Sequence, residues 1–186
     1  MVLKIRSVQV AENANNSPTS VTIQSAQGAS VSVNTANGDT INTSSGGVLS
    51  GQSKDGKTQI LGIQYDYQSF GVWNNGSGSG TVGAVTVGNA TAAANIPTTG
   101  SAAFTGKSLG VYGSSGAGYF TVADMTANVN FANRSIAFAT TNTTNTDTGA
   151  KVAGLNMGGL FAYNAGSGQF SGGVGTVNGM SGTGSG

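Results

Sequence analysis

The sequence predicts an all-β protein, and its composition is the first reason. Glycine supplies 32 of the 186 residues, and charged residues reach only 7%, against about 25% in a typical soluble domain. Glu, Lys and Arg, which favour helices, are therefore scarce, while Thr, Val and Asn are common. The second reason is the alternation of apolar and polar residues with period 2, which is typical of strands with one buried face.

The same composition excludes several classes of function. The chain has no histidine and no cysteine, which rules out His-based triads, thiolate nucleophiles, disulfides and imidazole or thiolate zinc sites. Six acidic residues are too few for an array of oxygen-ligated metal sites. A net charge of +1 offers no basic surface for nucleic acid. We therefore expect a protein that is not an enzyme and that binds no cofactor, metal or nucleic acid.

Residues 1–59 are predicted to form an irregular β segment of their own. Only short alternations, at Val21-Thr-Ile23 and Val31-Ser-Val33, stand between turn-forming residues such as Asn37-Gly38. They are short for independent strands, so an elongated hairpin, a lid and a stalk all remain open. The residues after Met1 lack the apolar core of a signal peptide, and no run of about 18 apolar residues predicts a membrane-spanning helix.

Longer strands are expected from residue 60 onward. The stretch Ile60–Trp73 is rich in aromatic and β-branched residues and ends at Asn74-Asn75-Gly76, a strong reverse-turn signal. Thr81–Val87 is predicted as the next strand, and a loop that ends at Ile96-Pro97 follows it. This spacing of strands and turns is typical of an antiparallel meander.

The clearest pair of strands is Ser101–Tyr112 and Tyr119–Phe131, joined by the glycine-rich turn Gly113–Gly118. In the second strand, apolar residues share one parity, while Asp124 and Asn128 lie on the other. Such alternation predicts one buried face. Four of its residues are expected to lie inside the fold: Tyr119, Met125, Val129 and Phe131.

Three further strands are predicted before the glycine-rich end of the chain. They are Ser135–Thr140, Leu155–Tyr163 and Gln169–Val177, with a polar loop at Thr141–Gly149 after the first. A meander must close or stack to protect its edges, and closure takes about eight strands. We therefore expect residues 60–186 to form a small, about eight-stranded antiparallel β-barrel, with one strand too few and an unpaired edge.

Several motifs between residues 60 and 186 resemble one known family. They are Tyr65-Asp-Tyr67 with Phe70-Gly-Val-Trp73, Pro97-Thr-Thr-Gly100-Ser-Ala-Ala-Phe104-Thr-Gly106-Lys107, Ala123-Asp124-Met-Thr-Ala127-Asn-Val129-Asn-Phe131-Ala-Asn133-Arg134, and Phe170-Ser-Gly172 with Gly182-Thr-Gly-Ser-Gly186. These motifs are similar to strands of the transferrin-binding protein B-like β-barrel domain family. The strand that normally closes the family's barrel has no counterpart in the sequence, which matches the missing strand of the meander.

The resemblance implies an eight-stranded barrel and a binding role, not a chemical reaction. It places the protein outside the cell or at the outer-membrane surface of a Gram-negative bacterium, with any membrane association made through a segment not in this chain. The resulting hypothesis is a non-enzymatic protein that engages an extracellular protein or a small solute through loops. Two alternatives stay open, a structural or adhesive extracellular β domain and, less favoured because aromatic girdles are missing, a transmembrane β-barrel.

Three predicted loops are the candidate contact regions: Asn74–Gly80, Gly113–Gly118 and Thr141–Gly149. Tyr112 and Tyr119 flank the second loop and are the candidate partner-contact residues, because tyrosine offers amphipathic contact area at low entropic cost. The alternative is that both tyrosines cap the end of the barrel. The motif Gly78-Ser-Gly80-Thr-Val-Gly83 precedes a strand, where a phosphate cradle would need a helix N-terminus. No residue is assigned a catalytic role.

Overall fold

The computed structural model describes residues 5–25, 30–44, 47–76, 81–89, 91–114 and 117–186, and it confirms the all-β class. The strands are β1 (Ile5–Glu12), β2 (Pro18–Ser25), β3 (Ser30–Asn34), β4 (Thr40–Thr43), β5 (Val48–Gln52), β6 (Thr58–Gln64), β7 (Gln68–Asn75), β8 (Thr81–Gly88), β9 (Ser101–Ser114), β10 (Ala117–Asn130), β11 (Ser135–Asn145), β12 (Met157–Tyr163), β13 (Phe170–Thr176) and β14 (Ser181–Ser185). The helices in the described chain are three-residue 3-10 turns, η1 (Thr35–Asn37), η2 (Ala93–Asn95) and η3 (Ala153–Leu155), and none of them is long and apolar enough to cross a membrane.

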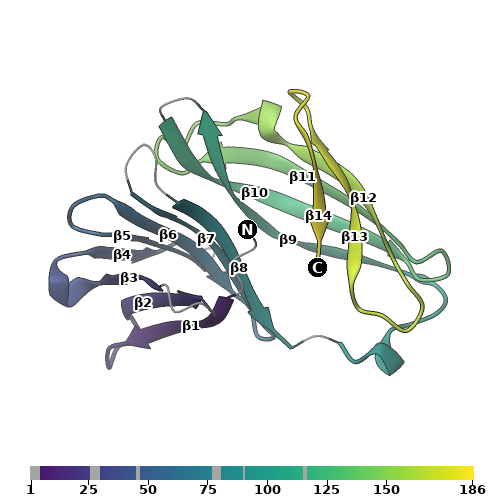
Figure 1. Ribbon diagram of the computed structural model, residues 1–186, viewed down its shortest axis with the longest axis horizontal. Helices are drawn as coiled ribbons and strands as arrows, with labels where there is room; N and C mark the ends of the chain where they lie inside the picture. The colour runs from purple at the N-terminus through teal and green to yellow at the C-terminus, as the bar shows by residue number, and fades with distance from the viewer. Residues whose placement is uncertain (1–4, 26–29, 45–46, 77–80, 90, 115–116) are drawn as a thin grey trace. The chain divides into compact units, whose positions relative to one another are not determined.

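The strands form three antiparallel sheets in which neighbours in sequence are neighbours in space (Figure 1). Their orders are β1-β2-β3, β4-β5-β6-β7-β8 and β14-β13-β12-β11-β10-β9. The chain divides into two compact units. We call residues 1–89 with 109–120 the sandwich unit, and residues 90–108 with 121–186 the meander unit.

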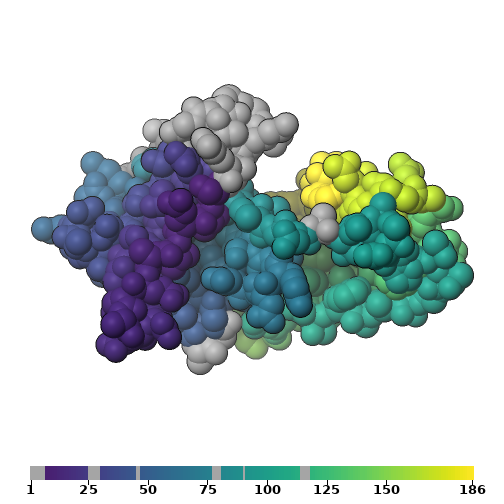
Figure 2. Space-filling view, turned by 90° about the horizontal axis from the view of Figure 1, so that it is seen from below, coloured from purple at the N-terminus to yellow at the C-terminus, as the bar shows by residue number. Residues whose placement is uncertain are grey.

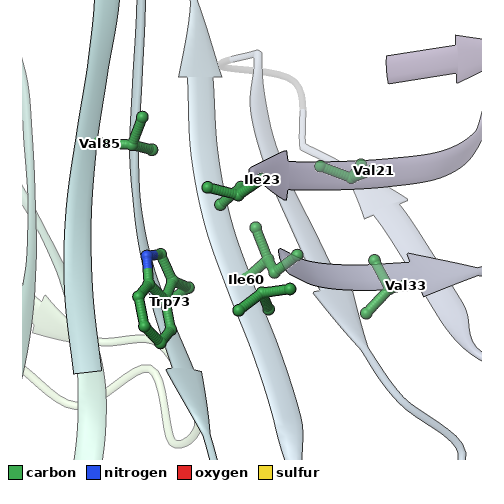
Figure 3. Close-up of a cluster of buried hydrophobic side chains, with 7 residues drawn as sticks. Val21, Ile23, Val33, Ile60, Trp73 and Val85 are labelled. Atoms are coloured by element: carbon green, nitrogen blue, oxygen red, sulfur yellow. The ribbon is translucent and has the colours of Figure 1, made fainter. Parts of the chain in front are cut away.

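In the sandwich unit, the sheet β1–β3 packs on one face of the sheet β4–β8. Figure 3 shows Val21, Ile23 and Val33 from the small sheet lying against Ile60, Trp73 and Val85 from the larger one. Val33 is 0% exposed and Ile60 is 2% exposed, so the core lies between the two sheets. The strands β1 and β2, purple in Figure 2, form an outer layer of this unit.

The N-terminal residues are therefore regular strands, which corrects the expectation of an irregular segment. Val21 and Ile23 of β2 pair with Val33 and Val31 of β3, and all four are buried. Two apolar side chains of one parity are enough for a short strand to contribute one face to a core. The expected boundary at residue 60 falls inside β6, which pairs with β5.

The predicted strand Ile60–Trp73 is wrong as a single element, because it folds as the hairpin β6–β7. Residues 65–67 form its exposed turn, and the Tyr65 N–H donates to Gln68 O at 2.7 Å. The aromatic side chains there suggested a continuous strand. In the structure, Tyr65 and Tyr67 are exposed at the turn, while Trp73 is carried to the core.

In the meander unit, the alternation of apolar and polar residues along β10 places the apolar side chains on one face of the sheet, as predicted. Val129 pairs with Ile136 of β11, and Ile136 pairs with Phe161 of β12. Met125, Val129 and Phe131 are half-buried, whereas Asn128 is exposed. Tyr119 is half-buried like these three residues, but its neighbour Phe120, in the segment 109–120 that belongs to the sandwich unit, is buried.

Aromatic rings lie over glycines of nearby strands, which explains part of the unusual composition. A Cβ on Gly83 would lie 2.5 Å from the Trp73 ring, one on Gly184 would lie 2.8 Å from the Phe161 ring, and one on Gly186 would lie 2.5 Å from the Phe170 ring. Real Cβ atoms do not approach so closely, so each ring requires the bare backbone beneath it.

The six-stranded sheet β9–β14 is open in the described part of the chain, with β9 and β14 at its edges. The strands β6–β8, which were expected to share a barrel with it, pair with β4 and β5 in the sandwich unit. The glycine-rich end of the chain, where no strand was predicted, forms β14.

Candidate binding sites

Tyr112 and Tyr119, the predicted contact residues, lie side by side across the β9–β10 hairpin. Their ring centroids are 5.2 Å apart and the ring planes are tilted by 42°. Both side chains are half-buried. The hairpin backbone is close here, since a Cβ on Gly118 would lie 3.2 Å from Tyr112 O. The pair therefore presents two adjacent phenol rings, a surface that can combine apolar contact with hydrogen bonding.

The three predicted loops differ from the observed structure. Residues 74 and 75 belong to β7, the Gly76 N–H donates to Lys57 O at 2.8 Å, and residues 77–80 lie outside the described residues. In the second loop, 115 and 116 lie outside them as well. The third prediction is wrong for residues 141–145, which continue β11. Thr143 is buried there because its backbone N–H and its hydroxyl both donate to Asn156 Oδ1, at 3.1 and 2.7 Å.

Asp124 sits in a polar network on the meander unit. Lys107 Nζ donates to its Oδ1 at 2.6 Å, and Asn142 Nδ2 donates to its Oδ2 at 2.9 Å. The hydrogen bond from Lys107 and then that from Asn142 lower the pKa of the Asp124 carboxyl. Because both carboxylate oxygens accept hydrogen bonds, the group is held ionised as an acceptor and is poorly suited to act as a general base.

A cleft of about 420 Å³ opens in the sandwich unit, and the sequence analysis did not predict it. Its apolar lining comes from both sheets and includes Val10, Val21 and Ile23 on one side and Leu49, Ile60 and Val85 on the other. Polar residues also line it: Glu12, Asn16, Thr43, Gln64 and Ser69. Val10 and Val87, another lining residue, stay 40% and 41% exposed, so the cleft reaches solvent.

The cleft exists because one cross-strand row of the large sheet is nearly empty. In that row Leu49 pairs with Gly62, Gly62 with Gly71, and Gly71 with Val85. Two glycines side by side place no side chain between the sheets, and stacked sheets lie about 10 Å apart. Their backbones form a bare floor between Leu49 and Val85.

The next row on the same face of the sheet is filled with side chains instead. Ile60 pairs with Trp73, and Trp73 with Gly83, so a ring covers the glycine. Gly51, the partner of Ile60 on its other side, is covered by Val33, since a Cβ on Gly51 would lie 2.7 Å from Val33 Cγ2. The sandwich is thus packed along one row and hollow along the next.

No three carboxylate, imidazole or thiolate groups gather into a metal-binding set within the described residues. Comparison with known proteins adds no relative to this picture: no protein-family model matches the chain, and no significant match is found among curated proteins.

Proposed function

We propose that the protein is a non-enzymatic binding protein, secreted or held at the outer surface of a Gram-negative bacterium. In this proposal it engages an extracellular protein or a small solute through the tip of the β9–β10 hairpin. The observation that carries the proposal is the adjacent pair Tyr112 and Tyr119, with ring centroids 5.2 Å apart. Paired tyrosines on neighbouring strands of a regular hairpin offer contact area that costs little entropy to immobilise.

A binding experiment with matched variants tests this proposal. The wild-type protein and the double variant Tyr112→Ser/Tyr119→Ser are immobilised and exposed to host secretions and to environmental extracts. Tyr67→Ser is the control, because Tyr67 is 80% exposed and lies on a different hairpin. We expect a partner that is retained by the wild type and by Tyr67→Ser but is lost from the double variant.

Two outcomes would count against the proposal. If the double variant retained the same partners, binding through the tyrosine pair would be the wrong mechanism. If no form of the protein retained a partner, the structural or adhesive alternative would be preferred.

We also propose that the sheet β9–β14 is part of a β-barrel wall. The consecutive antiparallel order of its six strands and its single apolar face support this, since barrels of about eight strands are built in the same way. A chain extended after Gly186 by a strand with alternating apolar residues should pair with β14 and raise the melting temperature. An unchanged melting temperature would contradict the proposal.

A further inference from the structure

The aromatic rings of this protein repeatedly lie over glycine. Trp73 covers Gly83, Phe161 covers Gly184, and Phe170 covers Gly186. The arrangement recurs in both units, on strands with different sequences. Its physical basis is that a planar ring gains dispersion contacts with a flat peptide backbone where no Cβ intervenes.

The floor of the cleft is also glycine backbone, but in the described chain no aromatic ring lies over it. Gly62 and Gly71 lie next to each other in the sheet. Among the described atoms, the only one within 4 Å of a Cβ built on Gly62 is the backbone oxygen of Phe70, whereas a Cβ on Gly71 would lie 2.7 Å from Leu61 O, so Gly71 is held tightly against the backbone of β6. Leu49 and Val85 flank the floor in the same row, and Ile23 lines the cleft from the opposite sheet. The space over these two glycines is therefore bounded by apolar side chains from the same sheet and from the facing sheet, as are the places where the protein's own rings lie.

The geometry points to a ligand site: we propose that the cleft binds a small planar aromatic molecule, with its ring face on the backbone of Gly62 and Gly71. A cleft of about 420 Å³ lies within the roughly 300–1,000 Å³ range of small-molecule sites. It exceeds the about 150 Å³ that suffices for benzene in an engineered cavity of another protein. The space suits two or three fused or linked rings.

The polar lining residues narrow the chemistry of the ligand. Gln64 and Ser69 pair with each other in the next row on the same face of the sheet as the glycines, and both line the cleft. They offer donors and acceptors to one hydroxyl or amine on the ring system. Glu12 is the one formally charged residue in the described lining, so it disfavours carboxylated ligands. The expected ligand class is a neutral or cationic aromatic alcohol or amine.

The test uses N-phenylnaphthylamine, a neutral aromatic amine whose fluorescence rises when it leaves water. The full chain should bind it at one site. Trp73 is the only tryptophan of the sequence, and its row adjoins that of Gly71, so its emission should be transferred to the bound probe. Absence of saturable binding, or binding without transfer from Trp73, would overturn the proposal.

A matched pair of substitutions locates the site. A Cβ on Gly62 meets its nearest described atom at 3.6 Å, so the sheet accepts Gly62→Val, and the new side chain fills the cleft. Gly173→Val is the control, because Gly173 is an exposed strand glycine with nothing within 4 Å of a Cβ. We expect Gly62→Val to weaken probe binding by at least about tenfold and Gly173→Val to leave it unchanged. Equal binding by both variants would refute the site.

A competition experiment on the wild-type protein tests the preference for a planar ring without any variant. Naphthol and decahydronaphthol carry the same hydroxyl and have the same carbon skeleton, but only naphthol is flat. Naphthol should displace the probe at a concentration about tenfold lower. Equal potency would show a general apolar cleft and would overturn the proposed selectivity for planar rings.

Discussion

The two units protect their apolar residues in different ways. In the sandwich unit two sheets face each other, and aliphatic side chains such as Val33 and Ile60 are almost fully buried. In the meander unit all strands belong to one sheet, and the apolar side chains of its protected face, such as Val129, are mostly half-buried. Phe161 is an exception, buried with its ring in edge-to-face contact with Phe138 and Phe170.

This difference shows two ways in which a glycine-rich chain can bury the apolar face of a sheet. A second layer lets small aliphatic residues form the core by area burial alone. Within one sheet, an aromatic ring instead lies sideways over the glycines of the next strands, as Phe161 does over Gly184. Hydroxyls also substitute for backbone partners there, since Met157 N–H donates to the buried Thr140 Oγ1 at 2.7 Å.

The largest expected effect comes from placing a charge in each apolar region. Val33→Asp buries an unpaired carboxylate between two sheets and should lower the free energy of unfolding by about 4 kcal/mol. Val129→Asp should cost about 1–2 kcal/mol, because a half-buried side chain keeps part of its hydration. Asn128→Asp, on the exposed face, should stay within about 0.5 kcal/mol. Urea denaturation followed by circular dichroism measures all three, and an equal cost for both valine variants would remove the distinction between the units.

A smaller effect is expected from a methyl group under a ring. Gly83→Ala pushes against Trp73, which is buried between two sheets, and should destabilise the protein by about 3 kcal/mol. Gly184→Ala pushes against Phe161, which lies on a single sheet, so about 1 kcal/mol is expected. The control Gly173→Ala should be nearly neutral, because its Cβ meets nothing within 4 Å. Thermal unfolding gives the order, and the reverse order would contradict the comparison.

The smallest effect concerns the exposed network around Asp124. Its pKa is lower in the folded protein than in the unfolded chain, chiefly through the hydrogen bond from Lys107. The stabilisation is therefore present above the unfolded-state pKa and is lost as the pH falls through the folded-state pKa. Wild type should lose more stability on acidification than Asp124→Asn, measured as melting temperature against pH. Parallel curves for the two proteins would show that the network contributes nothing to stability.

Local pattern predicted the strands of the meander unit better than those of the sandwich unit. The alternation around Val129 spans most of a long strand and oriented β10 correctly. Val31 and Val33 gave a signal of only two residues, and their burial depends on a facing sheet that local sequence does not reveal. Phe120 is buried and Tyr119 half-buried, although the alternation of β10 favoured Tyr119 as the residue facing inward.

Of the two candidate sites, the tyrosine pair could be predicted from local sequence and the cleft could not. Tyr112 and Tyr119 flank a predicted tight turn, so their proximity follows from hairpin geometry. The cleft depends on the register between β6 and β7, which places Gly62 opposite Gly71. The signal was present as two glycines inside apolar stretches, but reading Ile60–Trp73 as one strand concealed that they are partners.

The hairpin β9–β10 has a consequence for how the protein is made. Leu109–Phe120 clusters with the sandwich unit, whereas the flanking parts of both strands cluster with the meander unit. Each unit is thus assembled from two separate stretches of sequence, and no single cleavage of the chain separates one unit from the other. On the ribosome, the sandwich unit lacks its last segment until Phe120 has been synthesised, by which time residues 90–108 of the meander unit have already been added to the chain.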